Sequence, residues 1–223
     1  MIDSLLGFVA LHHCFGCSKT GTVLCTDCKY NIAEDTFSGC LVCARPALFG
    51  ICNRCKTTYE KAWCVGDRDG ILEQLINAYK FERVKRASVE LGALLDITLP
   101  VLPSETVVVP VPTVQSHIRI RGYDHAWLLS REFAKRRKLH VQSLILRSTT
   151  ASQRGLNKPE RMKEAKRAFY CKGDIDPHVP YLVIDDVVTT NATLRYAASA
   201  LREAGVGIVW AAAIARQPLD KQG

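Results

Sequence analysis

Eight cysteines between positions 14 and 55 constrain the fold more than any other feature of this chain. They form four C-x-x-C pairs, and each such turn can place two thiolates on one side of a metal ion. Two turns complete a tetrahedron of sulfur ligands. Seven residues separate the first pair from the second and eight separate the third from the fourth, which suits short ribbon-like loops. We therefore predict two consecutive four-cysteine zinc sites, one made by Cys14, Cys17, Cys25 and Cys28 and the other by Cys40, Cys43, Cys52 and Cys55.

The cysteine spacing leaves an interleaved pairing open, as well as one occupied site beside a degenerate one, with iron as a minority alternative to zinc. Four sulfur ligands leave no position for water, so each zinc would be structural. The segment has few apolar residues, so the metal would supply much of its folding energy. Because no export signal precedes the pairs, we expect a reducing, cytoplasmic compartment, where such clusters bind metal more often than they form disulfides. We interpret Cys64 and Cys171 as ordinary packed residues.

Beyond residue 60, short apolar runs alternate with helix-like stretches, which is typical of βα units in a mainly parallel sheet. We predict a zinc-ribbon module at residues 1–60 and an α/β domain at 61–223, with helices on both faces of the sheet. No apolar run approaches the roughly 20 residues of a membrane span. The expected strands are 62–65, 106–111, 141–146, 180–184 and 206–214, and the expected helices are 71–81, 87–99, 113–138 and 193–203.

The segment 181–194 carries the strongest indication of a binding site. Its apolar strand would deliver Asp185 and Asp186 to the carboxyl edge of the sheet, where ligands of such folds bind. A loop of small and hydroxylic residues then enters a helix, whose free N–H groups and dipole favour a phosphate. Two carboxylates beside a phosphate cradle suit a ribose 5-phosphate. The predicted cradle consists of Val187, Val188, Thr189, Thr190, Asn191, Ala192 and Thr193.

This segment resembles the fingerprint of the type I phosphoribosyltransferases. The resemblance implies that the acidic pair holds the ribose hydroxyls of phosphoribosyl pyrophosphate, bound with Mg²⁺, and that the loop holds its 5-phosphate. The family usually has Gly where this chain has Asn191. Asn is the residue that best replaces Gly at a positive φ.

Other motifs resemble the ComF family, and the resemblance covers nearly the whole chain. Val109 to Pro112 followed by Arg119 to Ala126 is similar to its PVP and RGFNQA motifs, with Asp124 and His125 replacing the usual Asn and Gln. Lys80 and Phe81, the loop from Thr150 to Leu156 with Arg161, and the paired C-x-x-C ribbons also match. This resemblance implies a cytoplasmic protein of natural competence that acts on incoming single-stranded DNA with a helicase-like partner.

The charge of the chain is unevenly distributed. Its net charge of +8 lies entirely beyond residue 60, and residues 119–167 hold 14 Lys and Arg against four acidic residues. A polyanion is the natural partner of such a segment, although a charge run can also be a solvated helix face.

Two functions fit these features. In the first, the protein is an enzyme that displaces pyrophosphate from the anomeric carbon, and Arg119 and Arg121 bind the leaving group because guanidinium suits phosphate. The loop 150–157 would close over the site. In the second, the fold is a binding module whose basic segment, helped by stacking on Tyr123 and Trp127, handles single-stranded DNA. The basic residues proposed for that role are Arg119, Arg121, Lys135, Arg136, Arg137, Lys138, Arg154 and Lys158.

Overall fold

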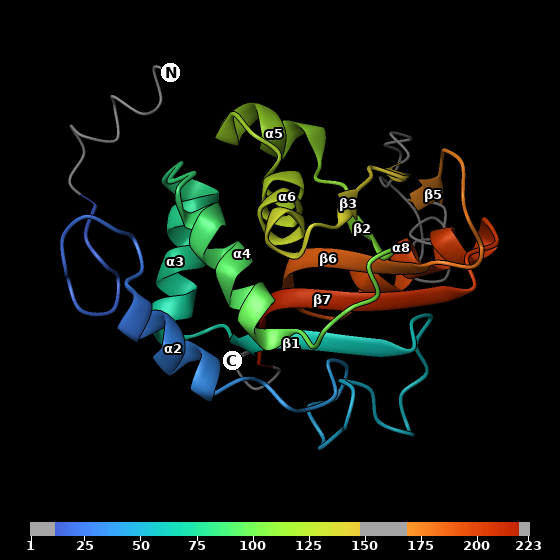
Figure 1. Cartoon of the computed structure of the whole chain (residues 1–223), viewed down its shortest axis with the longest axis horizontal. Coiled ribbons are helices and arrows are strands. Elements are labelled where there is room, and N and C mark those ends of the chain that lie inside the picture. The colour runs from blue at the N-terminus through green and yellow to red at the C-terminus, as the bar shows by residue number, and fades with distance from the viewer. Residues whose placement is uncertain (1–11, 148–168, 219–223) are drawn as a thin grey trace, which may run out of the picture.

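A five-stranded, all-parallel sheet organises the protein in a computed structural model that describes residues 12–147 and 169–218 (Figure 1). The strand order is β1-β7-β6-β2-β3, and every neighbouring pair is parallel. The central β6 pairs with β7 on one side and with β2 on the other. The strands are β1 (Lys61–Asp67), β2 (Val107–Pro110), β3 (His140–Val141), β6 (Pro180–Val188) and β7 (Ile208–Arg216).

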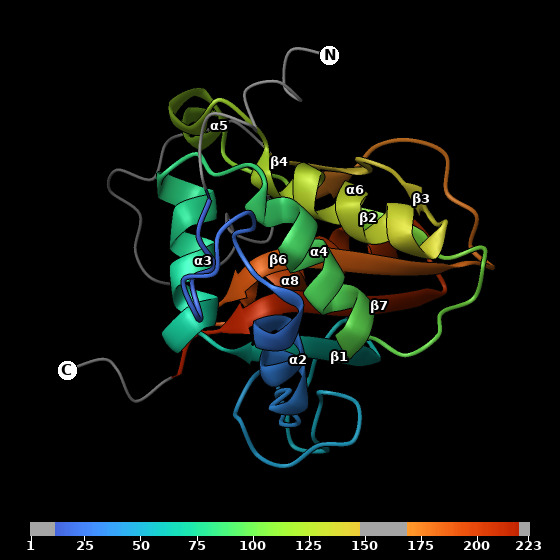
Figure 2. The ribbon, with the colours of Figure 1, turned by 60° about the vertical axis from the view of Figure 1, so that its left-hand side comes forward.

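Helices cover both faces of this sheet. On one face lie α3 (Gly70–Phe81), α4 (Ala87–Thr98) and α6 (His125–Arg137), whose apolar side chains share a core with Leu182 and Ile184 of β6. On the other face α8 (Ala192–Glu203) packs over Val183 and a small antiparallel pair, β4 (Ile145–Arg147) and β5 (Phe169–Cys171). Figures 1 and 2 show α4 and α6 on the side of the sheet opposite α8. The predicted α/β class, with a covered parallel sheet, is confirmed.

The strand that carries the acidic pair is longer than the sequence indicated. β6 continues to Val188, and its residues Val187 and Val188 pair with Ala215 and Arg216 of β7. The loop therefore spans residues 189–191 alone, since α8 begins at Ala192. The predicted loop from Val187 to Thr193 was too long because two charged residues appeared to end an apolar strand at residue 184, whereas pairing with β7 extends the strand four residues further, to Val188.

The prediction of one continuous helix at 113–138 is wrong, because the structure has two helices there. It consists of α5 (Gln115–Arg121) and α6, separated by Gly122 in the left-handed region at φ 81°. Glycine favours this termination of a helix, and Asp124 then caps α6 by accepting a hydrogen bond from the Trp127 N–H at 3.1 Å. The predicted strand 141–146 likewise divides between β3 and β4, which belong to different sheets, and β5 was not predicted.

The N-terminal segment forms two cysteine turns joined by α2 (Thr26–Glu34). Around the first turn, Val23 and Leu24 belong to the core under α3 and α4. Around the second, Leu41 and Tyr59 belong to the core under α8. The boundary proposed at residue 60 coincides with the start of β1, and it stays a prediction because the apolar residues on its two sides are continuous.

No helix in the described ranges combines the length and the apolar character that crossing a bilayer requires. The predicted closing loop at 150–157, together with Arg154, Lys158 and Arg161, lies outside the described residues.

Candidate functional site: two cysteine clusters and an acidic pair at the sheet edge

The eight cysteines gather into two compact groups. Within each group the four Sγ atoms lie within 4.8 Å of one another, and the members are the consecutive sets predicted from spacing: Cys14, Cys17, Cys25 and Cys28, and Cys40, Cys43, Cys52 and Cys55. The interleaved pairing is not found. Tetrahedral zinc with Zn–S bonds near 2.3 Å separates its sulfurs by about 3.8 Å. The Cys17–Cys25 and Cys43–Cys52 Sγ distances, 3.6 Å each, fit that geometry.

The backbone forms the same hydrogen-bonded turn in both cysteine groups. In the first, the Ser18 N–H donates to Cys14 O at 2.8 Å, and Ser18 has φ 60°. In the second, Ala44 repeats this bond to Cys40 O with φ 61°. The two C-x-x-C turns therefore share one backbone geometry. In the first group, the Cys25 N–H also donates to Cys14 Sγ at 3.3 Å.

Backbone N–H groups favour the thiolate form of one cysteine in each group. Burial raises the pKa of Cys14, but backbone hydrogen bonds from Cys25, Cys17 and Gly16 outweigh it and lower the pKa to about 6. For Cys52, a backbone hydrogen bond from Arg54 outweighs burial and lowers the pKa to about 6.

The hydrogen bond with Cys25 raises the pKa of Cys28 to about 12, and the hydrogen bond with Cys43 raises the pKa of Cys55 to about 12, so metal binding would displace those protons. The thiolate is the form that binds metal. Both clusters are therefore compatible with structural zinc.

Asp186 is a buried carboxylate whose charge is already balanced. Its Oδ1 lies 2.8 Å from Lys80 Nζ, and its Oδ2 lies 2.9 Å from His125 Nε2. Burial raises the pKa of Asp186, but the His125 hydrogen bond and the Lys80 ammonium overcome that effect and hold the pKa below its usual range. Asp186 therefore anchors α3 and α6 to the carboxyl end of β6.

Asp185 has the opposite electrostatic character. No ion pair to it occurs within 12–147 and 169–218, although its Oδ1 accepts the Asp186 N–H at 2.9 Å. Burial, reinforced by the Asp186 charge, raises the pKa of Asp185 to about 7. The two neighbouring carboxyls thus differ in role: Asp186 is held by the Lys80 ammonium and the His125 ring, and Asp185 has no ion pair in the described ranges.

Arg121 joins this network through His125, and Arg119 does not. The Arg121 guanidinium donates to His125 Nδ1 at 2.7 Å, so the other ring nitrogen, Nε2, carries the proton that faces Asp186. Arg121 also lies over the Phe81 ring, 5.7 Å from its centroid. Arg119 is exposed on α5. Of the two predicted pyrophosphate ligands, the structure places Arg121 beside the acidic pair.

The loop between β6 and α8 combines exposed hydroxyls with a buried turn residue. Thr189 and Thr190 are exposed, whereas Asn191 is 3% exposed and adopts φ 60° and ψ 6°. Asn191 occupies the N-cap of α8 without making a capping bond, and its Nδ2 has no hydrogen-bond partner among the described residues. Ala192 and Thr193 form the first turn of α8, where N–H groups lack intrahelical partners.

Three residues important to this geometry were missed as site residues. Lys80 and His125 were noted only as parts of motifs, and their contacts with Asp186 join residues far apart in the chain. Tyr59 had no sequence signal, yet its hydroxyl donates to Asn191 Oδ1 at 2.8 Å. The contact of Arg121 with His125 joins the last residue of α5 to the first residue of α6 across the turn at Gly122, so helical spacing did not indicate it.

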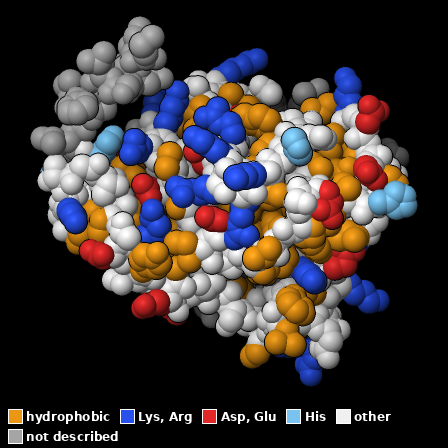
Figure 3. Space-filling model, in the orientation of Figure 1, with side chains coloured by type: hydrophobic (Ala, Val, Ile, Leu, Met, Phe, Trp, Pro, Cys, Tyr) orange, Lys and Arg blue, Asp and Glu red, His pale blue; other side chains and the backbone are white. Residues whose placement is uncertain are grey.

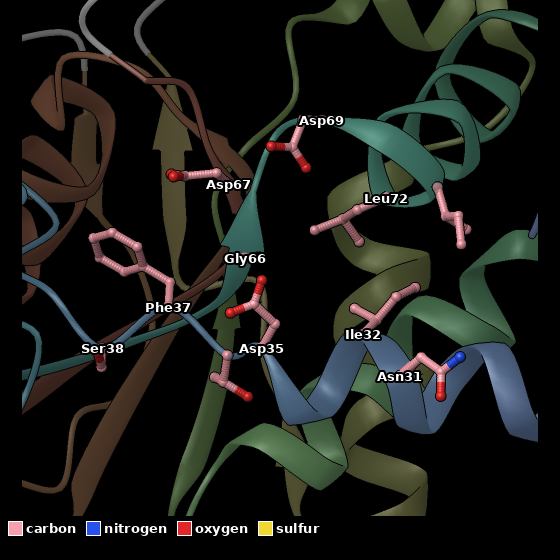
Figure 4. A pocket seen from close by; sticks show the side chains of 11 residues that line it. Asn31, Ile32, Asp35, Phe37, Ser38, Gly66, Asp67, Asp69 and Leu72 are labelled. Atoms are coloured by element: carbon pink, nitrogen blue, oxygen red, sulfur yellow. The ribbon is translucent and has the colours of Figure 1, made fainter.

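A separate pocket of about 460 Å³ lies at the carboxyl end of β1, between α2 and the start of α3 (Figure 4). The carboxylates of Asp35, Asp67 and Asp69 line it, together with apolar side chains such as Phe37. Asp67 is paired with Arg216 Nε at 3.0 Å. Neither carboxylate of the acidic pair lines this pocket, so it is distinct from the β6–α8 site.

The predicted DNA-binding residues are only partly free. Figure 3 shows Lys and Arg side chains interspersed with a few acidic ones on the face that carries α4 and α6. Arg137, however, bonds Asp96 and the carbonyl of Leu99, and Arg136 donates to a carbonyl of α4. Tyr123 is 9% exposed, with its hydroxyl bonded to Tyr79 O, so it is not a stacking surface. Trp127 is half-buried, and Lys135 and Lys138 lie at the end of α6.

No family model matches the chain. Over 213 residues it is 27% identical to competence protein F of Haemophilus influenzae, covering 87% of this chain and 91% of that protein. Over 206 residues it is 24% identical to competence protein ComFC of Bacillus subtilis, covering 84% and 81%. The predicted resemblance to ComF proteins is thus confirmed over most of the chain.

A hypoxanthine phosphoribosyltransferase from Staphylococcus aureus is among the solved structures that match, at 15% identity and a TM-score of 0.34 over 64% of this chain and 67% of that one. A TM-score of 0.34 is too low to establish a shared fold. The fold class accordingly rests on the observed sheet order, register and helix layers.

Proposed function

We propose that this ComF-like protein binds phosphoribosyl pyrophosphate with Mg²⁺ at the junction of β6 and α8. The observation that carries the proposal is the succession of four features along the chain: a central strand, Asp185 without an ion pair in the described ranges, a loop turned by Asn191, and the N-terminus of α8. This order places a hydrogen-bond acceptor for ribose hydroxyls next to N–H donors for the 5-phosphate.

The two carboxylates take unequal parts in this proposal. Asp186 is balanced by Lys80 and His125, so it positions the end of β6 and the side chains around it. Asp185 accepts hydrogen bonds from the ribose diol. Thr189, Thr190 and Thr193 add hydroxyl donors at the phosphate, since all three are exposed at the loop or the first helical turn.

The donor set also fits a hard cation. Carboxylate oxygen is a ligand that Mg²⁺ prefers, and Asp185 lacks a competing ion pair in the described ranges. When bound, the ion would neutralise charge on the pyrophosphate. A cation nearby would also lower the raised pKa of Asp185, so ligand binding would release a proton near neutral pH.

Pentosyl transfer is the reaction that this arrangement would serve. The bond from the anomeric carbon to a pyrophosphate oxygen would break as an acceptor attacks, through a transition state with oxocarbenium character. Arg121 is the candidate for binding the leaving pyrophosphate, because His125 holds it beside the acidic pair. The contribution of the protein would be positioning and electrostatic stabilisation.

Calorimetric titration with phosphoribosyl pyrophosphate and Mg²⁺ tests the proposal. We expect the wild type to bind, Asp185→Ala to lose at least about tenfold in affinity, and Glu203→Gln to bind as the wild type does. Glu203 is a suitable control because it is an exposed carboxylate at the far end of α8. Asp186→Ala is a poorer probe, since it would leave Lys80 and His125 without their buried partner. A wild type that does not bind refutes the proposal.

The second candidate is a non-catalytic adaptor for single-stranded DNA. Arg119, Lys135 and Lys138 favour it, because the structure gives them no intramolecular ion pair in the described segments. The curated relatives are named competence proteins. A steep loss of oligonucleotide affinity with added salt, reduced in a triple Ala variant of these residues, would support this function. Absence of binding at low salt would count against it.

A further inference from the structure

The residues that follow the second cysteine cluster lie against the predicted phosphate loop. Thr58 donates its hydroxyl to Arg195 O in α8 at 2.8 Å, and Glu60 forms an ion pair with Arg202 near the other end of that helix. Between them, the Tyr59 hydroxyl donates to Asn191 Oδ1. A segment that begins three residues after the last cluster cysteine, Cys55, is thus fixed along the helix that begins at the loop.

The Tyr59–Asn191 contact is deeply buried. Each of the two residues is 3% exposed, and the Tyr59 ring belongs to the core under α8 together with Leu194 and Ala198. Burial raises the pKa of Tyr59, so the phenol keeps its proton and serves as a donor at neutral pH. A hydrogen bond made in such surroundings is worth more than one exposed to water.

Asn191 requires such support for two reasons. Its φ of 60° lies in the left-handed region, which costs a residue with a side chain more than it costs glycine. An asparagine at a helix N-cap also usually gives its side-chain oxygen to an N–H of the first turn. Here that oxygen is bonded to Tyr59 instead, and Asn191 makes no capping bond. The first-turn N–H groups are left for a phosphate.

We propose that Tyr59 is a positioning residue of the phosphate site, which fixes the Asn191 turn and keeps the Asn191 oxygen away from the N-terminus of α8. The proposal rests on the function proposed above, because it concerns the affinity of the same loop. It gives residues 58–60 a role in ligand binding, although Tyr59 itself touches no ligand.

Four variants test this role. Tyr59→Phe removes the hydroxyl, Asn191→Gly removes both the strain and the competing oxygen, and the double variant combines them. Tyr181→Phe is the matched control, since Tyr181 is 2% exposed in the same core and its hydroxyl accepts the Asp176 N–H at 3.0 Å. Two quantities are measured: affinity for phosphoribosyl pyrophosphate with Mg²⁺, and hydrogen exchange of the amides at 191–194 in the ligand-free protein.

We expect Tyr59→Phe to weaken binding about five- to tenfold and to accelerate exchange at 191–194, as the loss of one buried hydrogen bond would do. Tyr181→Phe should destabilise the protein to a similar degree without changing either quantity. In the Asn191→Gly background, Tyr59→Phe should have no further effect on affinity.

The proposal is overturned if Tyr59→Phe alters stability alone, as Tyr181→Phe does, or if its effect on affinity is undiminished when Asn191 is Gly. If the wild type binds no phosphoribosyl pyrophosphate, the proposed function fails. The exchange rates at 191–194 still decide whether Tyr59 fixes the turn, so the two failures are distinguishable.

Discussion

The two cysteine clusters share one local design but have different surroundings. Each has a C-x-x-C turn with a left-handed residue, at Ser18 in the first cluster and at Ala44 in the second, and each brings four Sγ atoms together. The first packs on the face of the sheet that carries α3 and α4, and the second packs on the face that carries α8. The same four-cysteine unit therefore packs against a helix layer in one place and next to the predicted ligand loop in the other.

Because their surroundings differ, the two clusters should affect the stability of the protein and its affinity for a ligand differently. The first cluster connects to α4 through the ion pair of Lys29 and Glu90. The second connects through Tyr59 to Asn191. We infer that damage to the first cluster lowers stability alone, whereas damage to the second also lowers affinity for a phosphorylated ligand.

Metal removal is expected to have the largest effect. Chelation should abolish amide protection in residues 12–60 while β6 and β7 stay protected, because the metal supplies much of the folding free energy of a small cysteine-rich segment. Hydrogen exchange followed by mass spectrometry measures this directly. Simultaneous loss of protection in both parts would mean that the segment and the sheet form one cooperative core, and the proposed boundary at residue 60 would be wrong.

Single-cluster variants should divide the two roles. Cys25→Ser and Cys52→Ser should each lose one equivalent of zinc and destabilise the protein by more than about 4 kcal/mol. Only Cys52→Ser should weaken phosphoribosyl pyrophosphate binding beyond the effect of global unfolding, by about tenfold, measured below the unfolding transition. Equal affinity losses in the two variants would contradict the inferred difference between the clusters.

The two ion pairs that connect the cluster segments to the helices should contribute unequally to the free energy of unfolding, with the larger contribution from the pair near the first cluster. Lys29 Nζ lies 2.5 Å from Glu90 Oε2, and their side chains are only 17% and 9% exposed. Lys29→Met leaves a buried carboxylate unpaired, so we expect a loss of about 3 kcal/mol in the free energy of unfolding. Glu60→Gln removes the charge from the more exposed pair with Arg202 and should cost below about 1 kcal/mol. Chemical denaturation of both variants tests this order.

A smaller, pH-dependent effect is expected at the end of the sheet that the second cluster braces. The pKa of Asp185 is raised to about 7 in the folded state, above the usual 3.9 or so. Its contribution to stability is therefore fully present below about pH 4 and is lost as the pH rises through about 7. Asp185→Asn cannot ionise, so at pH 8 it should melt roughly 2–4 °C above the wild type, and at pH 5 the gap should shrink.

Ligand affinity should depend on pH in the opposite sense. A ribose diol and a cation both need the ionised Asp185 carboxylate, so binding should tighten as the pH rises from 6 to 8. Calorimetry in buffers of different ionisation enthalpy would detect the released proton. A pH-independent affinity would show that Asp185 does not contact the ligand.

The sequence by itself determined the elements whose signals are local. C-x-x-C spacing predicted the consecutive grouping of the cysteines that the structure has, because a turn of four residues and a short loop leave little freedom, although the spacing alone left an interleaved pairing open. The alternation of apolar strands with helical stretches indicated the covered parallel sheet. Gly122 is a typical helix C-terminal residue and Asp124 a typical N-cap, so together they would have divided the predicted long helix. Both act through hydrogen bonds within a few residues.

Only the tertiary structure decided which distant side chains meet. The pairing of β6 with β7 lengthened the strand and shortened the loop, and the packing of α3 and α6 brought Lys80 and His125 to Asp186. The contact between Tyr59 and Asn191 spans 132 residues. Such contacts depend on strand order and on which face of the sheet each segment covers. Composition, periodicity and spacing describe neighbours along the chain, so they do not predict contacts between residues that are far apart in the sequence.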